Sequence, residues 1–211
     1  IAYDAQGQQS LTWTDSTRTF APGTYTITET NVPGSFDYVS IGDINRNGLI
    51  DAYDISCVSV ELDGGVRHDN SQVEGSLTLT ATKDGNALTP AKDGTIRLSA
   101  GETIEVLVSG KDLKHVNALS FALPYDAASI EYTGIELLGM KDMVNLTYDR
   151  LHSDKTKALY PTFVNRGNNF LLDEGAPELF RLRFRALKAC SFNVKALDGL
   201  LVDRNLGTAT F

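Results

Sequence analysis

The chain has 211 residues, of which 42% are hydrophobic and 22% charged, as is typical of a soluble globular protein with one large domain or one domain and a small companion. Its formal net charge of −8 and its pI near 4.8 argue against a surface that binds nucleic-acid phosphates. Because the sequence contains no run of about 18 apolar residues, it predicts no membrane span.

Residues 1–39 show the two-residue periodicity of β-strands. Apolar and polar side chains alternate in residues 9–15 and again in residues 19–30, and the Ala-Pro-Gly sequence at residues 21–23 is typical of a turn. We therefore expect a β-rich N-terminal segment. The chain begins at Ile1 without a signal-peptide pattern, so we expect a fragment of a longer protein whose signal peptide lies upstream.

The segment that starts at Asp43 has the residue spacing of a twelve-residue calcium loop. Such a loop supplies oxygen ligands from positions 1, 3, 5, 7, 9 and 12 and has glycine at position 6, where the chain turns sharply. Gly48 is at position 6, and Asn and Asp supply the oxygens that a hard cation prefers. The predicted calcium ligands are Asp43, Asn45, Asn47, the carbonyl of Leu49, Asp51 and Asp54. An Asx-rich turn without a metal is the alternative.

The same loop resembles the variant found in dockerins. The matching residues are Gly42, Asp43, Asn45, Gly48, Asp54 and Ile55, whereas Asn47 is neutral where the family more often has Asp. A dockerin has two loop-helix segments and this chain has one, so the resemblance covers half a dockerin, residues 40–63. In dockerins, loop positions 10 and 11 recognise the partner protein, and here they are Ala52 and Tyr53. An ordinary first helical turn is the alternative for these two residues.

A helix is expected directly after the loop. Ile55, Val58 and Leu62 have the spacing of one helical face within residues 54–62, and the Asp-Gly-Gly sequence at residues 63–65 is typical of a helix end. Two valines lower the helix propensity, so this helix needs another surface to pack on.

Residues 76–211 form a succession of short alternating segments with turn signals between them, which is typical of an all-β sandwich. The expected strands are residues 77–82, 95–99, 103–109, 118–125, 130–138, 158–164, 179–187, 192–197 and 200–211. The clearest core rows are Ile104, Val106 and Val108; Leu119, Phe121, Leu123 and Tyr125; and Phe180, Leu182, Phe184 and Ala186. Before the sandwich we assign residues 40–65 to the loop and helix and the polar residues 66–75 to a linker.

Several stretches of this sandwich resemble cohesin domains. They are residues 100–108, where a glycine turn precedes an alternating strand, residues 116–126, which end in Tyr-Asp, the Ile/Tyr-rich residues 130–135, and residues 178–186, which are similar to the cohesin strand Leu-Phe-x-Ile-x-Phe-x-Ala. The resemblance spans residues 76–211 and implies a cohesin-like, jelly-roll type β-sandwich. The same architecture also serves carbohydrate-binding modules.

Two sets of side chains in the sandwich have two interpretations each. Arg181, Arg183 and Arg185 lie opposite a core row, either as a docking strip for an acidic partner or, as we favour, as a solvated face with cross-strand ion pairs. An aromatic set is either a glycan-stacking rim or part of the core. It consists of Tyr148, Tyr160, Phe163 and Phe170.

Residues suited to catalysis are scarce. The chain has 3 His and 2 Cys, and it lacks a nucleophile elbow, a zinc-protease helix, a phosphate loop and a dinucleotide fingerprint. We therefore predict that this fragment is not an enzyme. Cys57 and Cys190 are far apart among apolar neighbours, which favours buried free thiols over a disulfide.

Together, the two resemblances imply the C-terminal accessory region of a secreted, periplasmic or cell-surface bacterial enzyme, with a glycoside hydrolase as the parent. The first hypothesis is a calcium-binding region that associates, by cohesin/dockerin-type contacts, with its own or another chain's module. The alternative is a carbohydrate-binding module that targets the parent enzyme to polysaccharide. A third hypothesis keeps calcium as a folding staple without a partner.

Overall fold

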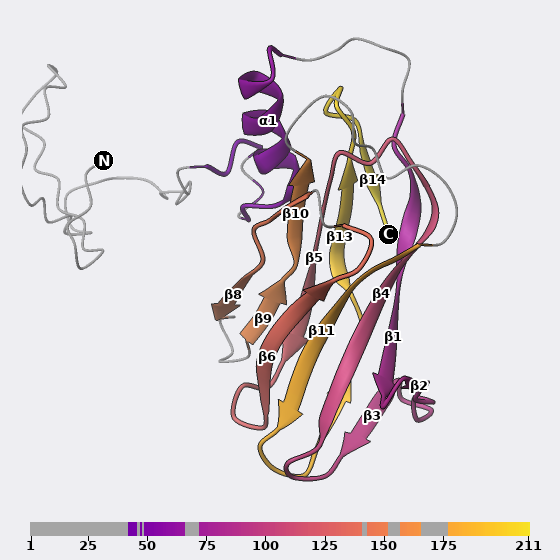
Figure 1. The fold of residues 1–211 in the computed structure, drawn as a ribbon. Helices are drawn as coiled ribbons and strands as arrows, with labels where there is room; N and C mark the ends of the chain where they lie inside the picture. The colour runs from indigo at the N-terminus through magenta and orange to yellow at the C-terminus, as the bar shows by residue number, and fades with distance from the viewer. Residues whose placement is uncertain are drawn as a thin grey trace, which may run out of the picture. The chain divides into compact units, whose positions relative to one another are not determined.

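The computed structural model describes residues 42–45, 47, 49–65, 72–140, 143–151, 157–165 and 177–211 (Figure 1). All of them belong to one compact unit, Val39–Phe211. The β-rich segment predicted for residues 1–39 lies outside the described residues. In the described part, no helix is long and apolar enough to cross a membrane.

The described residues contain one helix and 14 strands. They are α1 (Ala52–Leu62), β1 (Glu74–Lys83), β2 (Asn86–Ala87), β3 (Thr95–Leu98), β4 (Thr103–Lys114), β5 (Ala118–Tyr125), β6 (Ile130–Leu137), β7 (Met143–Asn145), β8 (Tyr148–Leu151), β9 (Lys157–Tyr160), β10 (Thr162–Asn165), β11 (Glu178–Ala186), β12 (Cys190–Asn193), β13 (Leu197–Val202) and β14 (Thr208–Thr210).

Two antiparallel sheets make the body of the fold. One has the strand order β2-β1-β4-β11-β6 and the other β14-β13-β5-β10-β7, with β9 paired to β5 and β8 paired to β9. The strands β12 and β3 pair in a third, two-stranded sheet. The mainly β sandwich predicted from the sequence is confirmed.

The core lies between the sheets, where the alternating apolar rows of β4, β5 and β11 meet. All three predicted rows are buried. Phe163 of β10 and Phe180 of β11 join the two sheets, with ring centroids 4.8 Å apart. Phe121 of β5 stacks on Phe180 at 6.3 Å. The period-two pattern therefore placed the core correctly, because successive side chains of a strand point to opposite faces.

Three predicted strands are divided in the structure. The run at residues 158–164 is broken at Pro161 into β9 and β10, since proline has no N–H for the ladder. The final run is the hairpin β13-β14, and the Asp203 carboxylate closes its turn by accepting the N–H groups of Asn205 and Gly207, both at 2.8 Å. The run at residues 192–197 is split between β12 and β13, and β2, β7 and β8 had no prediction.

The helix α1 forms where it was expected, two residues earlier than its predicted start. Asp51 is its N-cap and accepts the Tyr53 N–H at 2.8 Å, while the Asp54 carboxylate accepts the Asp51 N–H at 3.0 Å, so the two residues form a capping box. After Leu62 the chain leaves the helix through Asp63 and two glycines with positive φ.

The predicted packing face of this helix is wrong at two of its three residues, since only Ile55 packs on the sandwich. Val58 and Leu62 are 53% and 74% exposed, whereas Ala52, Ser56 and Ser59 are buried. Short side chains let the helix backbone approach the sheet closely, and of the larger apolar residues Val60 is also buried whereas Val58 and Leu62 are left on the outside. Cys57 and Cys190 are free thiols, as predicted, but both are half-buried.

Candidate functional site

The predicted calcium loop is folded by hydrogen bonds from its own backbone to its Asx side chains. The Asn47 N–H donates to Asp43 Oδ1 at 3.0 Å, and the Leu49 N–H donates to Asn47 Oδ1 at 2.9 Å. The Ile44 N–H donates to Asp54 Oδ1 at 2.6 Å, which ties the start of the loop to its last position. These bonds curl the loop toward its own side-chain oxygens. Arg46 and Gly48 lie outside the described residues.

Negative charge is concentrated and partly buried in this loop. Asp43 is 4% exposed and Asp54 is 1% exposed. Burial, and to a lesser extent the nearby Asp54 carboxylate, raises the pKa of Asp51, although hydrogen bonds from Asn47 and Tyr53 oppose the shift. A bound cation would offset this cost of holding carboxylates out of water.

The donor set fits a hard cation in kind. It combines three carboxylates with two amide oxygens and one backbone carbonyl, and calcium takes six to eight such oxygens. A carboxylate has about four lone-pair positions, so the two N–H bonds at Asp54 leave acceptor capacity. Within the described ranges, however, which include Asp43, Asp51 and Asp54, there is no group of three or more His, Cys, Asp and Glu side chains that could hold a metal. The calcium assignment therefore stays a prediction.

The helix α1 lies on the outer face of the β13-β5-β10 part of the second sheet (Figure 1). At its first turn the Ala52 N–H donates to Ser120 Oγ of β5 at 2.9 Å, and two turns later Ser59 Oγ donates to the Asn165 carbonyl of β10 at 2.9 Å. Both bonds are buried. Between them a small apolar cluster fills the interface, made of Ala52, Ala118, Val164 and Val202, with Tyr53, Ile55, Val144 and Leu200 at its edge.

The loop itself also contacts the sandwich. The Tyr148 hydroxyl of β8 donates to the Ile50 carbonyl at 2.9 Å. The Leu49 side chain packs on a cluster formed by Ala122, Ala158, Tyr148 and Tyr160. The two tyrosine rings are stacked, with centroids 5.3 Å apart and planes 12° from parallel. The second half of the loop is thus seated on β5, β8 and β9.

An ion pair holds the other end of the helix. Arg204, in the turn between β13 and β14, donates to the Asp63 carboxylate at 3.1 Å and to Asn117 Oδ1 at 3.2 Å. Its side chain is only 7% exposed, compared with 26% for Asp63. A nearly buried guanidinium needs such acceptors, because an unpaired buried charge is costly. We call the set of contacts at Ser120, Tyr148, Asn165 and Arg204 the clip interface.

The predicted partner residues of the loop lie at this interface. Ala52 is fully buried against the sandwich of the same chain, and Tyr53 is half-buried at the edge of the apolar cluster. Both therefore contact their own sandwich.

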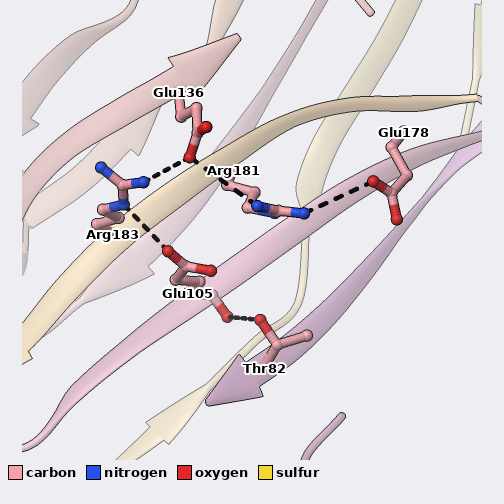
Figure 2. Close-up of polar contacts among 6 residues, drawn as sticks. All are labelled: Thr82, Glu105, Glu136, Glu178, Arg181 and Arg183. Carbon is pink, nitrogen blue, oxygen red and sulfur yellow. Dashed lines mark hydrogen bonds and ion pairs between the residues drawn. The ribbon is translucent and has the colours of Figure 1, made fainter. Parts of the chain in front are cut away.

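The predicted arginines lie on β11 of the other sheet, where each is paired with glutamate, and Figure 2 shows the pairs of Arg181 and Arg183. Arg183 donates to Glu105 at 3.0 Å and also pairs with Glu136. Arg181 lies 3.7 Å from Glu178 and 4.0 Å from Glu136, and Arg185 pairs with Glu131 at 2.7 Å. Except for Arg181 and Glu178, which both belong to β11, these are cross-strand pairs, as expected for a solvated face.

The aromatic set does not form an exposed rim where the structure describes it. Tyr160 and Phe163 are buried, Tyr148 is half-buried in the clip interface, and Phe170 lies outside the described residues. Across the described ranges, the large hydrophobic side chains classed as exposed are all aliphatic, and Tyr53, Tyr132, Tyr148 and Phe211 are half-buried.

The residues on the sandwich side of the clip interface were not predicted, although the residue pattern of β5 indicates a strand that is covered on both faces. Its core residues Leu119, Phe121 and Leu123 alternate with Ala118, Ser120 and Ala122, which are small, uncharged and also buried. A strand buried on both faces needs cover on its outer side. Ser120 belongs to that outer row, whereas Tyr148, Asn165 and Arg204 gave no comparable pattern.

Comparisons with known proteins find similarity only among solved structures. No protein-family model and no curated protein matches the chain. A chain in a type I cohesin–dockerin complex from Clostridium thermocellum is 13% identical with a TM-score of 0.40, over 53% of this chain and 80% of that one. The sixth cohesin of scaffoldin B from Acetivibrio cellulolyticus, in complex with a dockerin, is 13% identical with a TM-score of 0.40. The match covers 66% of this chain and 92% of that one. A non-cellulosomal cohesin from Archaeoglobus fulgidus is 13% identical with a TM-score of 0.35, and the match covers 55% of this chain and 83% of that one.

Proposed function

We propose that this chain is a non-catalytic protein-association region whose dockerin-like loop and helix occupy a face of its own cohesin-like sandwich. The observation that carries the proposal is the clip interface. It joins two segments that resemble mating modules through two buried hydrogen bonds, a tyrosine hydroxyl bond and a nearly buried ion pair.

The linker makes intramolecular association favourable. Only residues 66–71 separate the described end of the helix segment, Gly65, from Gln72 at the start of the sandwich. A short tether raises the effective concentration of one segment for the other to about the millimolar range. The loop-helix therefore needs only modest intrinsic affinity for the sheet face to remain on it.

Calcium is the proposed cofactor of the loop. Its ligands would be Asp43, Asn45, Asn47, the Leu49 carbonyl, Asp51 and Asp54. The burial of the Asp43 and Asp54 carboxylates supports a cation at this place. Calcium would fix the loop in the conformation from which α1 reaches the sheet.

The wider context follows from the resemblances stated above. We infer a secreted or cell-surface bacterial protein with a polysaccharide-degrading parent enzyme, in which this region holds modules together. Its partner is its own dockerin-like segment or the corresponding module of another chain.

Cutting the linker in the folded chain tests the association. A protease site is placed within residues 66–71, the protein is cleaved, and size-exclusion chromatography at about 10 µM shows whether the two pieces stay together in calcium and in chelator. We expect co-elution in calcium. Separation under both conditions would contradict the proposal, and co-elution under both would leave the association in place without a role for calcium.

Two helix variants provide the matched control for this cleavage. Ser59→Arg places a long charged side chain in the buried face and should release the loop-helix piece. Val58→Arg places the same side chain on the exposed face of the same helix and should leave the pieces together. If the cleaved pieces co-elute in both variants, or separate in both, α1 does not bind through the observed face.

A further inference from the structure

The loop and the sandwich meet at the peptide that would supply a calcium ligand. Leu49 offers its carbonyl to the proposed site, and its side chain is packed on an apolar cluster of the sandwich that includes Tyr160. The next carbonyl along the chain, that of Ile50, accepts the Tyr148 hydroxyl at 2.9 Å. The sandwich therefore holds the backbone on both sides of the Leu49 carbonyl.

The following residues are anchored in the same way. The Ala52 N–H is bonded to Ser120 Oγ at 2.9 Å. Asp51, the proposed ligand at position 9, lies between this anchor and the one at Ile50, and it also caps the helix. By contrast, the bonds that shape the first half of the loop run between residues of the loop itself, such as the one from the Asn47 N–H to Asp43.

Tyr148 is well placed to act as a rigid anchor. Its ring stacks on Tyr160 at 5.3 Å and 12°, and Tyr160 is itself buried in β9. Because the ring is held on one side, its hydroxyl loses little freedom when it binds the Ile50 carbonyl. Preorganisation of this kind lowers the entropy that a binding event would otherwise cost.

We propose that Tyr148 is a positioning residue that couples the sandwich to the calcium affinity of the loop. The inference rests on the proposed function, since it requires calcium at this loop. With the hydroxyl in place, the second half of the loop is already arranged when the ion arrives. Coupling between two binding events is reciprocal, so calcium must also tighten the loop-helix on the sandwich.

Calorimetric titration of the intact chain with calcium chloride tests this coupling. Tyr148→Phe keeps the ring stack and removes only the donor. Thr133→Val is the matched control, because the Thr133 hydroxyl also donates to a backbone carbonyl, that of Arg183 at 3.1 Å, but on the other sheet. Loss of one hydrogen bond should raise the Kd for calcium about fivefold in Tyr148→Phe, and by less than about twofold in Thr133→Val.

Amide hydrogen exchange distinguishes coupling from a purely structural role of Tyr148, because only coupling makes the protection of α1 by calcium depend on the Tyr148 hydroxyl. In the wild-type chain, calcium should slow exchange through α1, from Ala52 to Ser59, and in Tyr148→Phe this calcium-dependent protection should be smaller. Ser120→Ala, which removes the neighbouring anchor, is the second variant if Tyr148→Phe does not fold, and it should show the same two effects.

Two results would overturn the inference, and they differ from each other. Calcium binding by the wild-type chain with the same Kd in Tyr148→Phe and Thr133→Val would reject the coupling and leave the proposed function standing. Failure of the wild-type chain to bind calcium would reject the coupling together with the calcium site, whereas the association of loop-helix and sandwich is tested separately by the cleaved linker.

Discussion

Asp43 shows how a single residue connects charge, burial and metal binding. Its carboxylate is almost fully buried, and it accepts the Asn47 N–H that closes the first turn of the loop. An ionised carboxylate in such a place is stabilised by hydrogen bonds or by a cation. Its removal should therefore affect calcium binding more than folding.

Asp43→Ala should abolish stabilisation by calcium. At a calcium concentration about 100-fold above Kd, binding adds roughly 2.7 kcal/mol to the free energy of unfolding, and this difference should disappear in the variant. Thermal unfolding of the whole chain in calcium and in chelator measures it. Glu61→Gln, an exposed position on α1, is the control and should keep the difference. An unchanged calcium-dependent shift in Asp43→Ala would mean that the metal assignment is wrong.

At the scale of the element, α1 is held by its small residues. The face with Ala52, Ser56 and Ser59 is buried on the sheet, and Val58 and Leu62 face outward. The Ala52 backbone N–H donates to the Ser120 hydroxyl of β5, and the Ser59 hydroxyl donates to the Asn165 carbonyl of β10. The helix needs this support, because a short helix of mediocre propensity is marginal in water.

Ala52→Leu and Val58→Leu should therefore have unequal effects. Additional methyl groups at Ala52 enter a closed interface and should lower the free energy of unfolding by about 1–3 kcal/mol. At Val58 the same residue type is exposed and should change it by less than about 0.5 kcal/mol. Urea denaturation of the two variants measures both. Equal values would contradict the packing of α1 on β5.

At the scale of the whole molecule, the sandwich has its own core and the loop-helix adds to its outer face. Val73, just before β1, is part of that core, and its N–H donates to Asp203 at 3.1 Å. The sandwich therefore begins earlier than residue 76. Removal of the loop-helix uncovers the small residues Ala118, Val164 and Val202.

Residues 72–211 expressed alone should fold cooperatively, with less stability than the intact chain. Loss of three hydrogen bonds, from Ala52, Ser59 and Tyr148, suggests a decrease of about 3 kcal/mol in the free energy of unfolding, at roughly 1 kcal/mol for each. Chemical denaturation followed by circular dichroism measures this difference. An unfolded product would show that the sandwich depends on the loop-helix, and equal stability would show that the interface contributes nothing.

The sequence by itself determined the class of fold and the core. Alternation in β4, β5 and β11 places Val106, Phe121 and Leu182 inside, because side-chain direction in a strand depends only on position along it. The helix after the Asx-rich loop was also predicted, although its start was placed two residues too late because the capping pair Asp51 and Asp54 was not recognised. These features are local, so a short window contains all the information that they need.

Only the tertiary structure decided which face of α1 is buried and what it meets. The groups that receive the loop and helix, from Ser120 to Arg204, lie 68 to 141 residues away along the chain. Apolar spacing favoured Val58 and Leu62 as the packing face, but the outer row of β5 is made of small residues and accepts small residues closely. Complementarity of two surfaces depends on both partners, and the second surface exists only after the sheet has closed.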